Sequence, residues 1–199
     1  MTKAPRIGRV KSRLARGIGR VGAWAFYRQT LAAVCRPLAA DQRWTTWLAV
    51  SPDGTVHDDR VWPVQCSRLS QGGGDLGQRM GRVMEIMAPG PVVIIGADIP
   101  DIRPRHIAAA FAALGRYDAV FGPADDGGYW LVGLKRRPKI TSLFGGVRWS
   151  TEHTLKDTCA NLSKEAKIIF LETLTDVDEV SDLVRNQKSI SNHKSGYKF

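Results

Sequence analysis

Three acidic segments and one basic segment of the chain have residue types that could do chemistry together. Asp98 stands in GADIPD, Asp125 and Asp126 in GPADDGGYWLVGL, and Asp176 and Asp178 in TDVDEV. Carboxylate oxygens are ligands for hard divalent cations, and a carboxylate can also act as a general base. The alternative is structural, because aspartate is common in tight turns and at helix N-caps.

The basic segment KAPRIGRVKSRLA, residues 3–15, offers cations around a flexible loop. Lys3, Lys11 and Arg13 could neutralise phosphates, and Gly8 could let backbone N–H groups approach them. The GxxxxGK[ST] spacing of a P-loop is absent, so a solvated basic arm is the alternative.

Two further segments could border a ligand. In QGGGDLGQRM, residues 71–80, the glycines would let the backbone approach a base or sugar, while Asp75 could equally cap a helix. Trp149 could stack on a substrate or pack as a core aromatic. Gly127 and Gly128 allow a tight turn beside a ligand, or simply a hairpin.

Strand and helix patterns alternate between these segments. The patterns predict helices over 23–38, 75–87, 104–114, 150–161 and 177–186, and strands over 44–50, 61–66, 91–97, 118–121, 129–134 and 167–171. The run PVVIIGA is typical of a strand buried on both faces of a parallel sheet. The alternation predicts a Rossmann-like α/β sandwich, in which ligands bind beyond the carboxyl ends of the strands. We therefore expect Asp98, Asp125, Asp126 and the glycine loop to face one crevice.

Composition narrows the class of protein. The 199 residues favour one domain, predicted over 1–187, followed by a basic, disordered tail over 188–199. Three cysteines without metal-ligand spacing indicate reduced thiols in a cytoplasmic protein, and no apolar run is long enough for a membrane span. The net charge of +10 would attract nucleic acid, but no nucleic-acid-binding motif accompanies it, which makes that partner unlikely.

The order of KAPRIGRVKSRL, QGGGDLGQRM, GADIPD, GPADDGGYWLVGL, WST and DVDEVSDL resembles the DUF2064 family over about residues 1–186. Members are GT-A-like proteins of the nucleotide-diphospho-sugar transferase superfamily, and they are similar to the molybdenum-cofactor and phospholactate guanylyltransferases. The resemblance implies a GT-A three-layer α/β/α sandwich with a mostly parallel sheet. Family members usually begin with an apolar strand ahead of the KAPR loop, so we expect this sheet to lack its first strand and to expose unpaired backbone.

The resemblance also implies roles for the site residues. Phosphates would be held by Lys3, Gly8, Lys11 and Arg13, and the base or ribose would lie against Gly74, Asp75 and Gly77. Mg²⁺ or Mn²⁺ would bind Asp98, helped by Asp176 or Asp178, although GADIPD departs from the DxD signature of many glycosyltransferases. Substrate would contact Gly127, Gly128, Tyr129, Trp149, Ser150 and Thr151. Asp125 or Asp126 would be the catalytic base, with the other bracing the turn.

These roles predict a transferase that uses a nucleotide-sugar donor and a divalent cation. The first alternative is a guanylyltransferase-like nucleotidyltransferase that releases pyrophosphate. The second is a nucleotide-binding module without catalysis. The acceptor and the oligomeric state, including a homo-oligomer, stay open.

Overall fold

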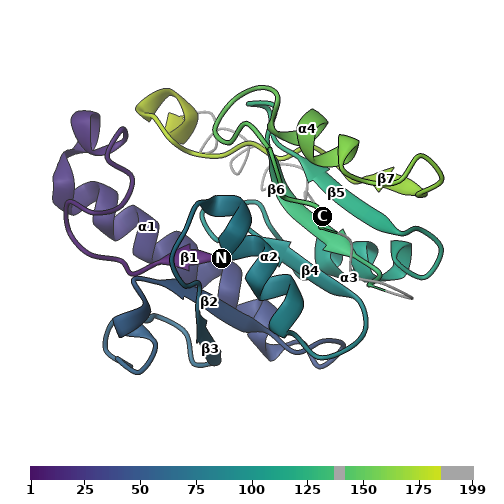
Figure 1. The fold of residues 1–199 in the computed structure, drawn as a ribbon. Coiled ribbons are helices and arrows are strands. Elements are labelled where there is room, and N and C mark those ends of the chain that lie inside the picture. The colour runs from purple at the N-terminus through teal and green to yellow at the C-terminus, as the bar shows by residue number, and fades with distance from the viewer. Residues whose placement is uncertain (137–141, 185–199) are drawn as a thin grey trace, which may run out of the picture.

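The computed structural model describes residues 1–136 and 142–184 (Figure 1). Its strands are β1 (Thr2–Lys3), β2 (Trp47–Ser51), β3 (Ser67–Ser70), β4 (Val92–Ile95), β5 (Ala119–Pro123), β6 (Tyr129–Leu134) and β7 (Ile168–Phe170). Its helices are α1 (Ala15–Ala40), α2 (Leu76–Ile86), α3 (Pro104–Ala113) and α4 (Thr154–Ala160), with a 3-10 turn, η1 (Asp53–Thr55). Residues 180–184 are also helical, whereas the predicted tail and the end of the predicted helix 177–186 lie outside the described residues.

The strands form two hydrogen-bonded sheets, ordered β1-β2-β3 and β4-β6-β5-β7. β1 with β2, β2 with β3, and β5 with β7 pair in parallel, while β6 runs antiparallel to β4 and β5. The reversal of β6 follows from the short turn that joins it to β5, because only antiparallel neighbours can be connected so tightly. The predicted, mostly parallel arrangement is confirmed, with β6 as the exception.

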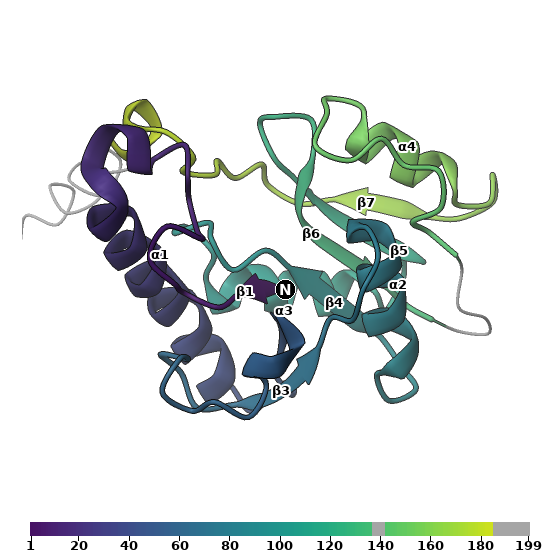
Figure 2. The ribbon, with the colours of Figure 1, turned by 60° about the vertical axis from the view of Figure 1, so that its left-hand side comes forward.

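Helices cover both faces of the strands, as Figure 2 shows. Successive side chains of a strand point to opposite faces, and β2 illustrates the result. Leu48 and Val50 join a core cluster with residues of α1 and α3, whereas Ala49 joins a second cluster with residues of α2. The chain therefore has the predicted three-layer α/β/α architecture, with one apolar core on each side of the strands.

The strand β1 is two residues long. Thr2 pairs with Val50, and the Met1 nitrogen donates to the Ile95 carbonyl of β4 at 2.6 Å. No ladder joins β2 to β4 among the described strands. A largely apolar groove of about 150 Å³ lies there instead, which we call the β2–β4 groove. Its wall includes Met1, Leu38, Trp44, Trp47, Ala49, Leu69, Val83, Val92, Val93, Ile94, Ile95, Ile107 and Phe111.

Two predicted elements are wrong. Residues 61–66 form a loop, because Pro63 lacks the N–H that a strand ladder needs, although Trp62 and Val64 are buried as the pattern suggested. The strand follows instead at β3. The predicted helix over 150–161 begins only at Thr154, because Ser150 adopts a left-handed backbone with a φ of 60°.

The remaining elements agree with the patterns to within a few residues, except that α1 starts eight residues earlier than its predicted start at residue 23. Gly19, with a φ of 77° and a ψ of 160°, breaks the regular helix inside α1. Asp75 is the predicted N-cap of α2: it accepts the Gln78 N–H at 2.8 Å, and the Gln78 side chain accepts the Asp75 N–H at 3.0 Å. Among the described helices, none is long and apolar enough to cross a membrane.

Candidate functional site

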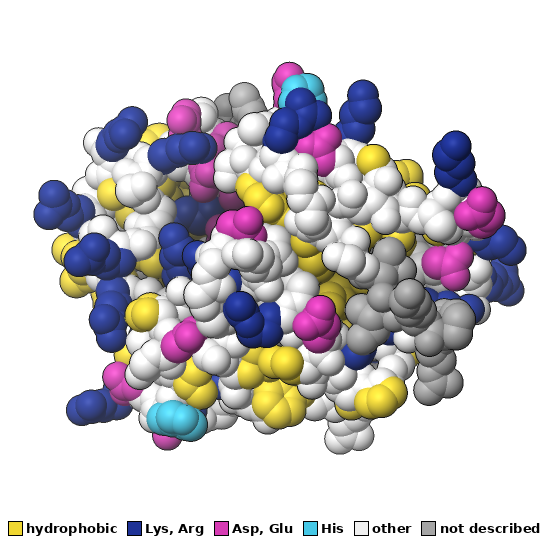
Figure 3. All heavy atoms as spheres, viewed as in Figure 1, with side chains coloured by type: hydrophobic (Ala, Val, Ile, Leu, Met, Phe, Trp, Pro, Cys, Tyr) yellow, Lys and Arg dark blue, Asp and Glu magenta, His cyan; other side chains and the backbone are white. Residues whose placement is uncertain are grey.

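A pocket of about 550 Å³ opens beyond the carboxyl ends of the strands (Figure 3). The loops after β4, β5 and β7 bring acidic residues to it, and the loop after β1 brings basic ones. Ligands of open α/β sheets bind at this edge. The predicted convergence of acidic residues is found here, whereas the predicted glycine-loop residues do not line the pocket. Of the predicted site residues, the pocket wall contains Lys3, Lys11, Arg13, Asp98, Asp126, Gly128, Tyr129, Trp149, Ser150, Asp176 and Asp178.

The most polar part of the pocket is the Lys11 cluster, which comprises Lys11, Asp98, Asp176 and Asp178. The Lys11 Nζ lies 3.0 Å from Asp98 Oδ2, 2.8 Å from Asp176 Oδ1 and 2.9 Å from Asp178 Oδ1. The Lys11 side chain is only 5% exposed, whereas the carboxylates are partly open to solvent. Arg13 adds a second, exposed cation 3.4 Å from Asp178. Two loops far apart in sequence thus converge on one buried ammonium group.

The charges of the Lys11 cluster alter its pKa values. Burial opposes the charged form of Lys11, but the carboxylates of Asp98 and Asp176 outweigh it and raise the pKa of Lys11 above its ordinary value. Burial, together with the charge of Asp98, raises the pKa of Asp176 to about 6, although Lys11 acts in the opposite direction. The cluster therefore holds a firmly protonated lysine beside carboxylates that crowd one another.

The side chains of Asp125 and Asp126, which follow β5, lie in different surroundings. Asp126 lines the pocket, and its Oδ1 accepts the Gly128 N–H at 2.9 Å. Asp125 lies outside the pocket wall and accepts a hydrogen bond from the Thr175 hydroxyl. Gly127, with a φ of 82°, turns the chain where an added Cβ would come within 2.4 Å of the Glu152 carbonyl oxygen. The turn thus presents Asp126 to the pocket and fastens Asp125 to the neighbouring loop.

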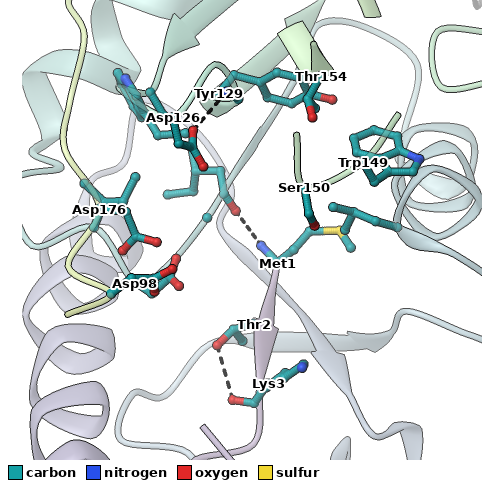
Figure 4. Close-up of a pocket in the computed structure, with 18 of the residues that line it drawn as sticks. Met1, Thr2, Lys3, Asp98, Asp126, Tyr129, Trp149, Ser150, Thr154 and Asp176 are labelled. Carbon is teal, nitrogen blue, oxygen red and sulfur yellow. Dashed lines mark hydrogen bonds between the residues drawn. The ribbon is translucent and has the colours of Figure 1, made fainter. Parts of the chain in front are cut away.

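The opposite wall is aromatic and hydroxylic. Figure 4 shows Asp98 and Asp176 next to each other on one side of the pocket, with Trp149 and Ser150 across from them. Burial raises the pKa of Tyr129 above its ordinary value, so this phenol is neutral at physiological pH. A flat, partly apolar wall that faces a charged one suits a ligand with a ring at one end and phosphates at the other.

Several predicted site residues lie outside the pocket wall, namely Gly8, Gly74, Asp75, Gly77, Asp125, Gly127 and Thr151. Besides Asp125 and Gly127, three of them have structural roles. Asp75 caps α2, and Gly77 lets that helix approach the Trp149 ring, which an added Cβ would reach within 2.8 Å. The Thr151 hydroxyl donates to the Arg148 carbonyl in the turn before α4. Their predicted contacts with a ligand stay predictions.

The pocket wall also contains polar residues that were not predicted as site residues, namely Thr2, Arg9, Ser12, Tyr27, Gln71, Arg79 and Thr154. Arg79 stands in the QGGGDLGQRM segment that the sequence had indicated, and its Nε donates to the Gly74 carbonyl at 2.8 Å. Gln71 is buried, and its Nε2 donates to the Thr2 carbonyl at 3.0 Å and the Ala49 carbonyl at 2.8 Å. Gln71 thereby ties β1 to β2 at the edge of the pocket.

The Lys11 cluster also has the chemistry of a divalent cation site. Its three carboxylates supply hard oxygen donors around one point, which suits Mg²⁺ or Mn²⁺. In the described residues, however, no three ligating side chains stand in an arrangement that could hold a metal ion. The physical reason is that the carboxylates surround an ammonium group at 2.8–3.0 Å, well beyond a Mg²⁺–oxygen bond of about 2.1 Å.

Comparison with solved structures agrees with this architecture. A protein from Desulfovibrio desulfuricans G20, provisionally named a nucleotide-diphospho-sugar transferase, superposes with a TM-score of 0.84 and 30% sequence identity over 92% of this chain and 81% of that one. The 4-diphosphocytidyl-2C-methyl-D-erythritol synthase of Anaerococcus prevotii DSM 20548 superposes with a TM-score of 0.58 at 9% identity, over 81% of this chain and 86% of that one. The second likeness shows a shared fold alone.

No curated protein matches the sequence. The family model described as "Uncharacterized protein conserved in bacteria (DUF2064)" matches residues 34–151, more than half of the chain. That match includes the glycine loop, Asp98 and the whole GPADDGGYWLVGL segment. The chain therefore belongs to the DUF2064 family and has the fold of the nucleotide-diphospho-sugar transferases.

Proposed function

We propose that this protein is a glycosyltransferase that takes a sugar from a nucleoside-diphosphate donor and uses a divalent cation at the diphosphate. The observation that carries the proposal is the pocket itself, where a basic loop and three carboxylates meet on one side and aromatic and hydroxyl groups on the other. The name of the Desulfovibrio relative points to the same class of donor.

In this proposal the donor diphosphate lies along the basic wall. Lys3, Arg9 and Arg13 line the pocket there and would offset the phosphate charge. Asp98 and Asp176 would hold the cation, which when bound stabilises negative charge on the departing diphosphate. Arg79 projects from α2 into the same wall and would contact the base or ribose. Positioning and electrostatic stabilisation would supply most of the rate enhancement.

The acceptor would enter beside Asp126. The Asp126 carboxylate would take the proton from an acceptor hydroxyl as the hydroxyl oxygen bonds to the anomeric carbon of the donor sugar. At the same time the bond between that carbon and the diphosphate oxygen would break, and nucleoside diphosphate would leave. Asp126 suits this role better than Asp125, because only Asp126 lines the pocket. Trp149 offers a face on which a sugar or acceptor ring could stack.

The test is product analysis with purified protein, Mg²⁺ or Mn²⁺, a panel of nucleotide sugars and a panel of nucleoside triphosphates. Thermal-shift screening first selects the nucleotides that raise the melting temperature. Release of nucleoside diphosphate from a nucleotide sugar supports the proposal. Release of pyrophosphate from a triphosphate instead assigns nucleotidyl transfer, and binding without turnover would show a nucleotide-binding module.

The two neighbouring carboxylates provide a matched pair of variants. We expect Asp126→Asn to lower kcat by about 100-fold or more, since it removes the proposed base. Asp125→Asn changes the adjacent residue in the same way but outside the pocket, and its kcat is expected to stay within about tenfold of the wild type. Equal losses in the two variants would contradict the assignment of Asp126 as the base.

A further inference from the structure

The Lys11 ammonium occupies the point at which the three carboxylates of its cluster converge. Its three contacts, at 2.8, 2.9 and 3.0 Å, come from residues in the loops after β4 and β7. The ammonium donates hydrogen bonds to Asp176 and Asp178 and forms an ion pair with Asp98. At 5% exposure the side chain lies inside the cluster and is shielded from solvent.

A divalent cation and this ammonium cannot share the carboxylates. Mg²⁺ binds oxygen at about 2.1 Å, so the carboxylates that hold Lys11 would have to close in by nearly 1 Å around a metal ion. The ammonium would then lie in the metal's own position. Charge argues in the same direction, because among the described residues the ion pairs of these three carboxylates are formed with Lys11 and the exposed Arg13. Replacing the lysine charge by a divalent one would balance the group.

We infer that Lys11 is an internal cation that competes with the divalent cation for Asp98, Asp176 and Asp178. The metal site forms when the ammonium moves away toward a phosphate group in the pocket. Lys11 stands between the basic residues of the loop, with Arg9 and Arg13 both in the pocket wall, so an incoming phosphate would meet Lys11 within this group of cations. Phosphate and metal would therefore bind cooperatively.

The role of the phosphate group in this inference rests on the proposed function. The competition between Lys11 and a divalent cation does not, because it is a property of the protein without nucleotide. It can be measured with Mn²⁺ alone, by calorimetry and by electron paramagnetic resonance, without nucleotide and without turnover. We expect Lys11→Met to bind Mn²⁺ roughly 10- to 100-fold more tightly than the wild type, within the usual range of coupling between two sites.

Two controls locate the effect. Lys3→Met removes the same charge from the same pocket, so it reports the general electrostatic contribution, and its gain in Mn²⁺ affinity should be much smaller. Adding Asp98→Asn to Lys11→Met should abolish the gain. Equal Mn²⁺ affinity in the wild type and Lys11→Met would overturn the inference, as would a gain that persists in the double variant.

The removal of Lys11 leaves three carboxylates without their buried counter-charge, so the variant can be less stable. Lys11→Gln, whose amide can still donate to one carboxylate, is the second variant, and its unfolding is followed with and without Mn²⁺. The same competition predicts that Mn²⁺ raises the melting temperature of Lys11→Gln more than that of the wild type. If the Lys11 variants gain Mn²⁺ affinity but no donor is turned over, the competition stands and the proposed transferase function fails.

Discussion

Met1 lies in the wall of the pocket that contains the Lys11 cluster and also in the wall of the β2–β4 groove, yet the two regions are held together by different interactions. In the cluster, a buried ammonium group is surrounded by three carboxylate oxygens. In the groove, the facing edges of β2 and β4 are joined by no ladder among the described strands, and apolar side chains line the space between them. The loops of the Lys11 cluster are thus held together by ion pairs, while no ladder joins the described strands on either side of the groove.

This contrast shows where the geometry of the pocket can be weakened. The carboxylates of the Lys11 cluster come from the β4-β6-β5-β7 sheet, whereas Lys11 follows β1 in the other sheet. The cluster therefore spans the division between the sheets. Anything that joins β2 to β4 should stabilise the pocket, and anything that loosens β1 should disturb it.

The largest effect is expected from filling the groove. We predict that adding four β-branched apolar residues ahead of Met1 stabilises the protein by about 3 kcal/mol, because they would extend β1 in register beside Leu48 and Trp47 and bury apolar side chains. That corresponds to a rise in melting temperature of about 6–12 °C, measured by circular dichroism. A Gly-Ser extension of equal length is the control, and equal melting temperatures for the two extensions would show that the groove does not accept a strand.

A smaller effect is expected from loosening β1. Gln71→Met removes the amide that donates to the carbonyls of Thr2 and Ala49, and leaves both buried acceptors without that donor. We expect a loss of about 2 kcal/mol in the free energy of unfolding, measured by urea denaturation. Gln65→Met, a change of the same type at an exposed position, is the control. A loss no larger than that of the control would show that Gln71 does not hold β1 to β2.

The contrast between the two regions also explains what the sequence could predict. The polar ends of the strands could be predicted from the sequence, because a buried apolar run followed by aspartate marks the edge of a sheet. Asp98, Asp126 and Asp176 lie in the wall of one pocket. The pairing of Lys11 with Asp98, Asp176 and Asp178 could not be predicted, because the fold joins Lys11 to residues that are distant in the sequence, two of them 165 and 167 positions away. The residue type shows that Lys11 is basic, but only the fold shows that its ammonium group is paired with three carboxylates.

Local backbone chemistry accounts for the other misses. The run around Trp62 has the apolar content of a strand, and its side chains are buried, yet Pro63 prevents a continuous ladder. Ser150 is a good helix cap by residue type, but its left-handed backbone places it in the turn before α4. Side-chain burial was predictable in both segments, whereas backbone conformation depended on neighbours that the sequence pattern does not report.

The smallest expected effect concerns the support beneath the pocket. Trp130 lines the pocket, and the buried His106 packs edge-on against it at 5.6 Å between ring centroids. The His106 Nδ1 accepts the Arg103 N–H at 3.1 Å, and its Nε2 lies 2.6 Å from Glu172 Oε1. The Arg105 Nε also donates to the His106 Nε2 at 3.1 Å. An imidazole that accepts a hydrogen bond at Nδ1 is uncharged, because both ring nitrogens of the charged form carry protons.

Burial lowers the pKa of His106 below its ordinary value of 6.5, with Arg105 and Arg103 adding to the shift and Glu172 and Asp101 opposing it. The unfolded chain therefore binds a proton at a higher pH than the folded chain does, so stability falls as the pH drops through 6.5 and below. We expect His106→Gln to show a shallower fall in melting temperature between pH 7 and pH 5 than the wild type. His153→Gln, at a more exposed histidine, is the control. If His106→Gln keeps the wild-type slope, His106 does not contribute to the pH dependence of stability.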